Sequence, residues 1–189
     1  MGRWTPDAQG RLREAALALY RERGFEQATV SDIAERAGVT ERTFFRHFAD
    51  KREVLFAGSE QLQEAVVAAI LAAPADATPF QAAAEGVAAA GRAIQQNDVD
   101  DFPRQRAGVI AANASLQERE LLKLSRLAAG AAQALRDRGI AEPAASLAAQ
   151  TALGAFHVAF QRWVDEPGGC ALDARIAEAL DGVAGLLRS

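Results

Sequence analysis

The sequence lacks the features that mark several classes of protein. Its single cysteine, Cys170, excludes an internal disulfide framework and a cysteine-built zinc site. It has no run of about 18 apolar residues, and its first residues have no apolar core of the kind found in secretory signals. The myristoylation pattern fails as well, because Pro6 stands where serine or threonine is required. We therefore expect a reduced, cytoplasmic protein that does not span a membrane.

The chain also contains little that could carry out catalysis. Histidine occurs only at His47 and His157, and the sequence has no nucleophile motif, P-loop or dinucleotide-binding motif. We therefore expect no catalytic residue, no metal and no cofactor. An enzyme is the less favoured alternative, and turnover of a substrate by the purified protein would support it.

Charge is unevenly divided along the chain, whose formal net charge is −4. Residues 1–55 carry ten basic and nine acidic residues, a net charge of +1. The remaining residues carry eleven basic and sixteen acidic residues, a net charge of −5. This modest asymmetry is compatible with a nucleic-acid-binding N-terminal part on an acidic body.

The composition predicts an all-α fold. Residues with high helix propensity dominate, and no stretch shows the sustained two-residue alternation of a β-strand. Capping patterns mark three helix starts, at Thr5 before Pro6 and at the capping boxes of residues 29–32 and 50–53. Turn signals complete the division into helices, expected over residues 6–23, 30–37, 40–48, 50–72, 79–95, 102–114, 116–138, 143–165 and 171–188.

The segment 40–48 has two different faces when it is placed on a helix. Phe44 and Phe48, four residues apart, share one face and can pack against Ile33 of the preceding helix. The opposite and flanking positions carry Glu41, Arg42, Thr43, Phe45, Arg46 and His47. Two short helices joined by a turn at Gly38 form a helix-turn-helix unit, which lays its second helix in the major groove of DNA.

The outward side chains suit recognition of DNA. Arg42 can form a bidentate pair with guanine, worth ~1–3 kcal/mol of discrimination. Thr43 can contact a phosphate or a base, and Phe45 can pack on sugars or thymine methyl groups. His47 and Lys51 suit phosphates, and the amides at the neighbouring helix starts add affinity for anions.

The same pattern allows another interpretation. A short amphipathic helix with two arginines is more often a solvated face, and a lone histidine such as His47 is more often an ordinary surface residue. The rival function is a helical protein-interaction module that binds an acidic partner and has only weak, salt-sensitive, non-specific DNA affinity. Phe45 favours DNA binding, because an aromatic ring exposed beside Arg42 and Arg46 gains nothing from water.

The run TVSDIAERAGVTERTFFRHFADKREVL resembles the DNA-binding segment of TetR-type repressors. It follows the pattern T-V-x-x-I-A-x-x-A-G-V-T-x-x-T-F-F-x-H-F-x-x-K-x-x-L, and the resemblance spans about residues 8–58. One position departs, because Phe45 stands where the family often has a tyrosine whose hydroxyl reaches a phosphate. The resemblance implies that DNA contacts come from Thr29, Ser31, Thr40, Glu41, Arg42, Thr43, Phe45, Arg46, His47 and Lys51.

The resemblance also implies a domain layout. Residues 1–57 would form the DNA-binding domain, and residues 58–189 a helical domain for ligand binding and dimerisation. The last two helices would pair with their mates in a homodimer, so the double-stranded DNA operator would be near-palindromic. The candidate stripes are Ala148, Ala152, Ala155 and Ala159 on one helix and Leu172, Ile176, Leu180, Val183 and Leu187 on the other. Alternatively, both stripes face the monomer's own core.

A small-molecule effector is the second partner that the resemblance implies. A mostly apolar pocket with a few polar anchors is the common design for such a site, and Arg106, Gln150 and His157 are the candidate anchors. The predicted ligand-binding residues are Phe102, Arg106, Ile110, Leu122, Leu127, Gln150, Phe156, His157, Phe160 and Trp163. Each of them has a plainer interpretation as an ordinary core residue or a structural histidine.

The segment DFPRQRAGVIAANASLQERE resembles the R-x-x-x-I-x-x-x-P-x-L region of a TetR subgroup that senses acyl-CoA-like ligands. Arg106, Ile110 and Leu116 match that pattern, whereas Ala114 stands where proline is expected. The sequence thus predicts a DNA-binding transcriptional regulator. It would be a repressor released from its operator by a small hydrophobic or acyl-like effector.

Overall fold

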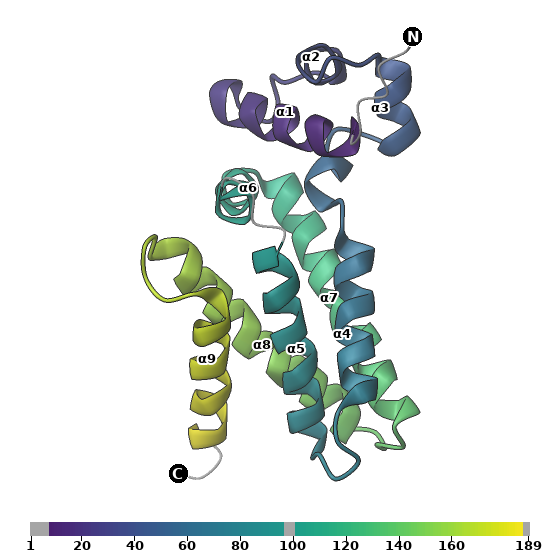
Figure 1. Ribbon diagram of the computed structural model, residues 1–189, viewed down its shortest axis with the longest axis vertical. Helices are drawn as coiled ribbons and strands as arrows, with labels where there is room; N and C mark the ends of the chain where they lie inside the picture. Colours follow the sequence, from purple (N-terminus) through teal and green to yellow (C-terminus); the bar gives the residue numbers. More distant parts are fainter. Residues whose placement is uncertain (1–7, 97–100, 187–189) are drawn as a thin grey trace. The chain divides into compact units, whose positions relative to one another are not determined.

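The computed structural model describes residues 8–96 and 101–186, and all regular secondary structure in these ranges is helical (Figure 1). This confirms the predicted all-α fold. The elements are α1 (Ala8–Arg23), α2 (Val30–Arg36), α3 (Glu41–His47), the 3-10 helix η1 (Glu53–Phe56), α4 (Ser59–Ala72), α5 (Pro79–Gln96), α6 (Phe102–Ala111), α7 (Ala114–Asp137), α8 (Ala144–Asp165) and α9 (Leu172–Leu186). The expected helix start at Thr5 and Pro6 lies outside the described residues, as does Leu187.

The predicted helix over residues 50–72 is not continuous. Asp50 does act as a cap, because its carboxylate accepts hydrogen bonds from the backbone amides of Arg52 and Glu53, at 2.8 and 3.1 Å. The turn that follows is the short η1, after which Gly58 adopts a left-handed conformation with φ of +88°. Because a left-handed residue cannot continue a helix, α4 begins afresh at Ser59.

The same break bears on membrane insertion. Within the described residues, the stretch Glu53–Ala72 is long and apolar enough to cross a membrane by length and composition alone. However, α4 itself has 14 residues, which at about 1.5 Å per residue fall short of the ~30 Å of a bilayer core. Val66 and Ile70 are fully buried in a protein core, so we interpret α4 as a core helix of a globular fold.

The chain divides into two compact units. One contains residues 1–57 and 102–119, and the other contains residues 58–101 and 120–189. The segment 102–119 thus groups with the N-terminal residues, whereas the predicted layout assigns it to the C-terminal domain. The division into a DNA-binding domain and a domain for ligand binding and dimerisation stays a prediction.

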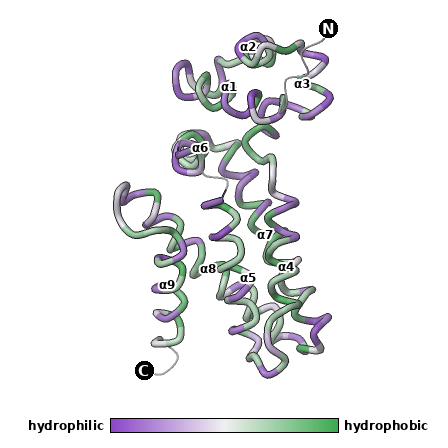
Figure 2. The backbone as a smooth tube through the Cα atoms, in the orientation of Figure 1, coloured by the Kyte–Doolittle hydropathy of each residue, from purple (hydrophilic) through white to green (hydrophobic). Residues whose placement is uncertain are grey.

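The N-terminal unit packs α1, α2, α3 and η1 around a common core. Leu12 of α1, Ile33 of α2 and Phe44 of α3 are completely buried in it, together with Val54 of η1. The later segment contributes Val109, Ile110 and Leu116 to the same cluster. Figure 2 shows hydrophobic and hydrophilic residues following one another along the helices of this unit, and in α3 only Phe44 is buried.

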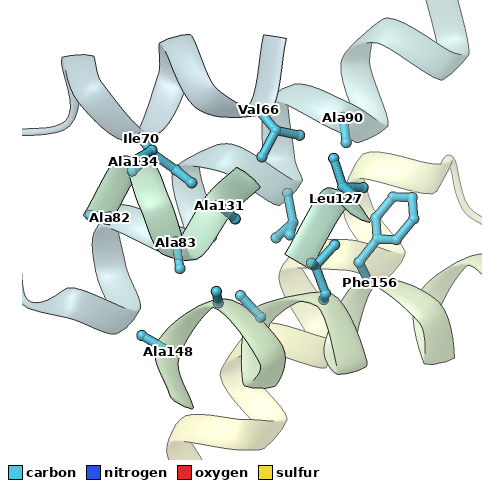
Figure 3. Close-up of a cluster of buried hydrophobic side chains, with 14 of the residues drawn as sticks. Val66, Ile70, Ala82, Ala83, Ala90, Leu127, Ala131, Ala134, Ala148 and Phe156 are labelled. Carbon is cyan, nitrogen blue, oxygen red and sulfur yellow. The ribbon is translucent and has the colours of Figure 1, made fainter. Parts of the chain in front are cut away.

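The C-terminal unit is built around an alanine-rich core shared by α4, α5, α7, α8 and α9. Figure 3 shows its alanine, valine and leucine side chains pointing toward one another from these helices. Small side chains let the helices approach closely. At Gly86 of α5 an added Cβ would lie only 2.8 Å from Cγ1 of Ile70 and 3.1 Å from Cγ1 of Val66.

The predicted dimerisation stripes face inward. The four alanines of α8 (Ala148, Ala152, Ala155 and Ala159) are all buried within the monomer. In α9, Leu172 and Ile176 are fully buried as well. The alternative, that the stripes face the monomer's own core, therefore fits the four alanines of α8 and Leu172 and Ile176 of α9, whereas Leu180 and Val183 are half-buried. A homodimer through the last two helices stays a prediction. Small residues on α8 serve close packing inside one subunit.

Candidate nucleic-acid interface

Helix α2 begins at a complete capping box. The Thr29 hydroxyl oxygen accepts from the Asp32 amide at 3.1 Å, and the Asp32 carboxylate accepts from the Thr29 amide at 2.9 Å and from its hydroxyl at 2.6 Å. These bonds from Thr29 hold the pKa of the Asp32 carboxyl below its usual range. The Thr29 hydroxyl is therefore engaged in the cap, while Ser31 in the first turn is exposed.

The turn between α2 and α3 depends on Gly38. Its φ of +66° lies in the left-handed region that favours glycine, and the Val39 amide bonds back to the Ala34 carbonyl at 2.9 Å. A side chain from α1 secures the same turn, because Arg11 donates to the Ala37 carbonyl at 2.9 Å. The bond from Arg11 therefore ties the turn between the two short helices to α1.

Helix α3 is capped by Thr40, whose hydroxyl oxygen accepts from the Thr43 amide at 3.2 Å and lies 3.1 Å from the Thr43 hydroxyl. Phe44 is completely buried and packs against Phe48, with ring centroids 5.6 Å apart. This buried pair fixes which face of α3 looks outward. As predicted from the helical spacing, Glu41, Arg42, Phe45, Arg46 and His47 are all exposed on the rest of the helix.

The two arginines of α3 differ from the other arginines around them. Within the described part of the chain, Arg42 and Arg46 form no ion pair, hydrogen bond or ring contact. By contrast, five arginines nearby are engaged: Arg11 with the Ala37 carbonyl, Arg21 with Gln105, Arg23 with Asp32, Arg36 with Glu22 and Arg52 with Asp50. Two guanidinium groups without internal partners therefore flank the exposed ring of Phe45, which is 55% accessible.

Lys51 lies in a different environment from the one predicted. Its ammonium group donates to the carbonyls of Phe25, Glu26 and Ala28, at 2.9, 3.1 and 3.0 Å. An ammonium has three hydrogens, so no hydrogen is left over for a phosphate. The sequence could not reveal these contacts, because the acceptors lie 23 to 26 residues earlier, and the predicted phosphate contact of Lys51 stays a prediction.

The predicted ligand-binding residues are divided between the two units. Phe102, Arg106 and Ile110 belong to the N-terminal unit. There the Phe102 ring lies under the guanidinium of Arg13 at 4.5 Å, and Ile110 is buried. The Arg106 guanidinium donates to the Leu55 carbonyl and lies 5.0 Å from the centre of the Phe56 ring. These three residues pack the N-terminal unit together.

The other seven candidates belong to the C-terminal unit and fall into two groups. Leu127, Phe156 and Trp163 are buried in its core, and half-buried Phe160 stacks on Phe156 with ring centroids 6.1 Å apart. Leu122, Gln150 and His157 are exposed instead. Of the three predicted polar anchors, Arg106 belongs to the N-terminal unit, whereas Gln150 and His157 lie exposed on α8 of the C-terminal unit. The ligand-binding role of these ten residues stays a prediction.

The geometry of the N-terminal unit is that of a helix-turn-helix protein, with a supported α3 presented as the exposed helix. Comparison with known proteins agrees. Residues 12–57 match the family described as bacterial regulatory proteins, tetR family. Over 71 residues the chain is 46% identical to the HTH-type transcriptional regulator TcmR of Streptomyces glaucescens, a match that covers 38% of this chain and 31% of that one.

Solved structures extend the likeness along the chain. A Syntrophomonas wolfei protein assigned to the TetR family aligns with a TM-score of 0.70 at 17% identity, covering 96% of this chain and 95% of the other. The Thermus thermophilus repressor FadR, solved with lauroyl-CoA, aligns with a TM-score of 0.55 at 20% identity over 92% and 91% of the two chains. At these identities the structures establish the fold. Together the comparisons show a TetR-type DNA-binding segment over residues 12–57 and, along the rest of the chain, a fold shared with these solved structures.

Proposed function

We propose that the protein is a sequence-specific DNA-binding regulator that reads its operator with α3. The observation that carries this proposal is the pair of unpartnered guanidinium groups, Arg42 and Arg46, on either side of exposed Phe45. A cation that is already paired inside the protein has little to gain from a phosphate or base edge, whereas these two have their donors available. Thr43 and His47 flank them on the same helix.

Repression is the mode of regulation that we propose, with a cytoplasmic protein acting on chromosomal DNA. The Thermus protein of similar fold is a repressor by name, and it was solved with lauroyl-CoA. A small hydrophobic or acyl-like effector is accordingly the proposed signal. Such an effector releases the operator only if it binds the DNA-free arrangement more tightly, and couplings of ~1–3 kcal/mol are typical.

We further propose a homodimer formed through the outer face of α8. Four positions on that face are exposed in the subunit and follow one another at helical spacing: Leu147, Thr151, Gly154 and Val158. Leu147 and Val158 expose 64% and 54% of their surfaces, and Gly154 lets a second helix come close. A two-fold dimer presents two copies of α3, so its operator is an inverted repeat with half-sites about one helical turn apart.

Competition binding tests the proposal directly. Fluorescence anisotropy measures binding to the DNA upstream of the protein's own gene, with scrambled DNA as competitor, at near-physiological salt. We expect a preference of ~10³-fold or more. Equal affinity for the two DNAs, repeated with fragments selected from the whole genome, would instead support the interaction module with non-specific DNA affinity.

The matched pair Arg42→Ala and Arg36→Ala identifies the reading residue. Both residues are exposed arginines of the helix-turn-helix unit, but Arg36 is held by Glu22. Arg42→Ala should lose about 1–3 kcal/mol of operator affinity and relax the preference at one base pair. Arg36→Ala should leave that preference in place. Unchanged operator affinity in Arg42→Ala would show that another residue reads the base.

A further inference from the structure

Lys51 occupies the position between α3 and η1, and its side chain reaches back to the loop between α1 and α2. Its ammonium nitrogen lies 2.9 to 3.1 Å from three carbonyl oxygens of that loop. It also lies 4.6 Å from the centre of the Phe25 ring. All three ammonium hydrogens are therefore used within the protein, and the ring covers a further side of the charge.

A second hydrogen bond links Lys51 to α1, and here the backbone carbonyl of Lys51 is the acceptor. The buried hydroxyl of Tyr20, in α1, donates to the backbone carbonyl of Lys51 at 2.6 Å. The rings of Tyr20 and Phe25 meet edge to face, with centroids 5.2 Å apart. Lys51 thus contacts both the end of α1, through Tyr20, and the loop of residues 25–28. We call these contacts the Lys51 clasp.

The choice of lysine at this position is informative. The chain contains only two lysines, Lys51 and Lys123, beside nineteen arginines. A compact ammonium can direct its three hydrogens at three converging carbonyls. A phosphate contact makes no such demand, because arginine binds phosphate at least as well. The residue type therefore agrees with an internal role.

We propose that Lys51 is a positioning residue, which holds the loop of residues 25–28 against the end of α3, and that it is not a phosphate-binding residue. Its effect on DNA is indirect, because the loop leads into α2 and the clasp sets the placement of α2 and α3. This consequence rests on the proposed DNA-binding function. The clasp itself can be tested without DNA.

Chemical labelling of amines tests the clasp. The full-length protein is treated with acetic anhydride, and the acetylation of Lys51 is followed by mass spectrometry in the folded protein, in urea and with operator DNA. An ammonium must leave its three acceptors before its nitrogen can attack the reagent. We expect Lys51 in the free folded protein to react at least roughly tenfold more slowly than in urea, and DNA to add no protection.

The opposite pattern would overturn the inference. If Lys51 in the free protein reacts as fast as in urea and becomes protected only on operator DNA, it is a phosphate contact. The variant Tyr20→Phe provides a second readout, because it removes the hydroxyl that holds the Lys51 carbonyl and leaves the ammonium in place. It should raise the acetylation rate of Lys51. No change in that rate would show that the two contacts do not act together.

The salt dependence of operator binding supplies the functional readout. Lys51→Met should lower the unfolding midpoint and weaken operator binding, without changing the slope of log K against log salt. Arg46→Met, which removes an exposed and unpartnered cation of α3, should reduce that slope by about 0.9 and leave the midpoint unchanged. A reduced slope with unchanged stability in Lys51→Met would contradict the proposal. Absence of any specific DNA binding would count against the proposed function, while the labelling result would still decide the clasp.

Discussion

Arg36 of α2 and Glu22 of α1 form a two-bond ion pair, in which Nη1 and Nη2 of the arginine each lie 2.6 Å from a carboxylate oxygen. The bond from Arg36 holds the pKa of the Glu22 carboxyl below its usual range. Because this pair satisfies Arg36 inside the unit, its charge is compensated before any partner approaches. Arg42 and Arg46 of α3, by contrast, have no such carboxylate partner among the described residues.

The capping box of α2 should contribute measurably to stability. Thr29→Ala removes the hydroxyl that caps the Asp32 amide, and loss of such a cap costs about 1 kcal/mol of unfolding free energy. Urea denaturation at pH 7 measures the loss. Thr29→Ser is the control, since it keeps the hydroxyl and should remain within a few tenths of a kcal/mol of the parent protein. Equal losses in both variants would show that the methyl group, not the cap, matters.

The same cap predicts a pH effect. The folded protein lowers the pKa of Asp32, chiefly through the side-chain hydrogen bond from Thr29. The ionised form is therefore favoured by folding, and its contribution is present above the unfolded pKa of about 4 and lost as the pH falls through the lower folded value. Unfolding midpoints between pH 7 and pH 3 should show a smaller Asp32-linked loss in Thr29→Ala. An identical pH dependence in both proteins would contradict this assignment.

Arg138 should be the most important surface arginine for the stability of the C-terminal unit. Its guanidinium donates to the carbonyls of Ile70, Leu71, Ala73 and Pro74 at the end of α4, at 3.1, 3.1, 2.7 and 2.6 Å. Arg138→Met leaves these carbonyls without a donor and should cost about 1–3 kcal/mol of unfolding free energy. Arg136→Met, which removes exposed side-chain contacts to Glu142 and Gln133, should cost less than about 1 kcal/mol. Equal costs would mean that the α4 end is held by other contacts.

Gly86 should not tolerate a methyl group. Alanine favours a helix by about 1 kcal/mol over glycine, but overpacking a core costs about 1–3 kcal/mol, and here the added carbon meets Ile70 and Val66 at 3.1 Å or less. We expect Gly86→Ala to lower the free energy of unfolding. In contrast, a Cβ at Gly108 of α6 would meet no described atom within 4 Å, so Gly108→Ala should stabilise the protein. Thermal unfolding of both variants checks the pair.

The proposed dimer predicts a selective effect of charge on the outer face of α8. Leu147→Glu places a charge at a position that is 64% exposed in the subunit, so the isolated subunit should fold as before while the dimer dissociates. Leu121→Glu on α7 is the matched control, because Leu121 is 65% exposed but lies outside this face. Sedimentation equilibrium gives the dissociation constants. A dimer that persists in Leu147→Glu would place the subunit contact elsewhere.

Much of the helix-turn-helix unit could be predicted because its signals are local. The cap at Thr29 depends on Asp32, the cap at Thr40 depends on Thr43, and the left-handed turn depends on Gly38 alone. The four-residue spacing of Phe44 and Phe48 in turn predicts the outward face of α3. Interactions over three or four residues follow from helical geometry, so the sequence alone contains them.

Other features depended on partners far along the chain. The sequence by itself determined the helices, the caps and the face that α3 exposes, because each follows from neighbours within one turn. Only the tertiary structure decided that Lys51 bonds carbonyls 23 to 26 residues earlier, that Arg106 bonds a carbonyl 51 residues earlier, and that the alanines of α8 face their own subunit. The physical reason is that the sequence shows which side chains must be buried or paired. Which partners they meet depends on how distant helices pack.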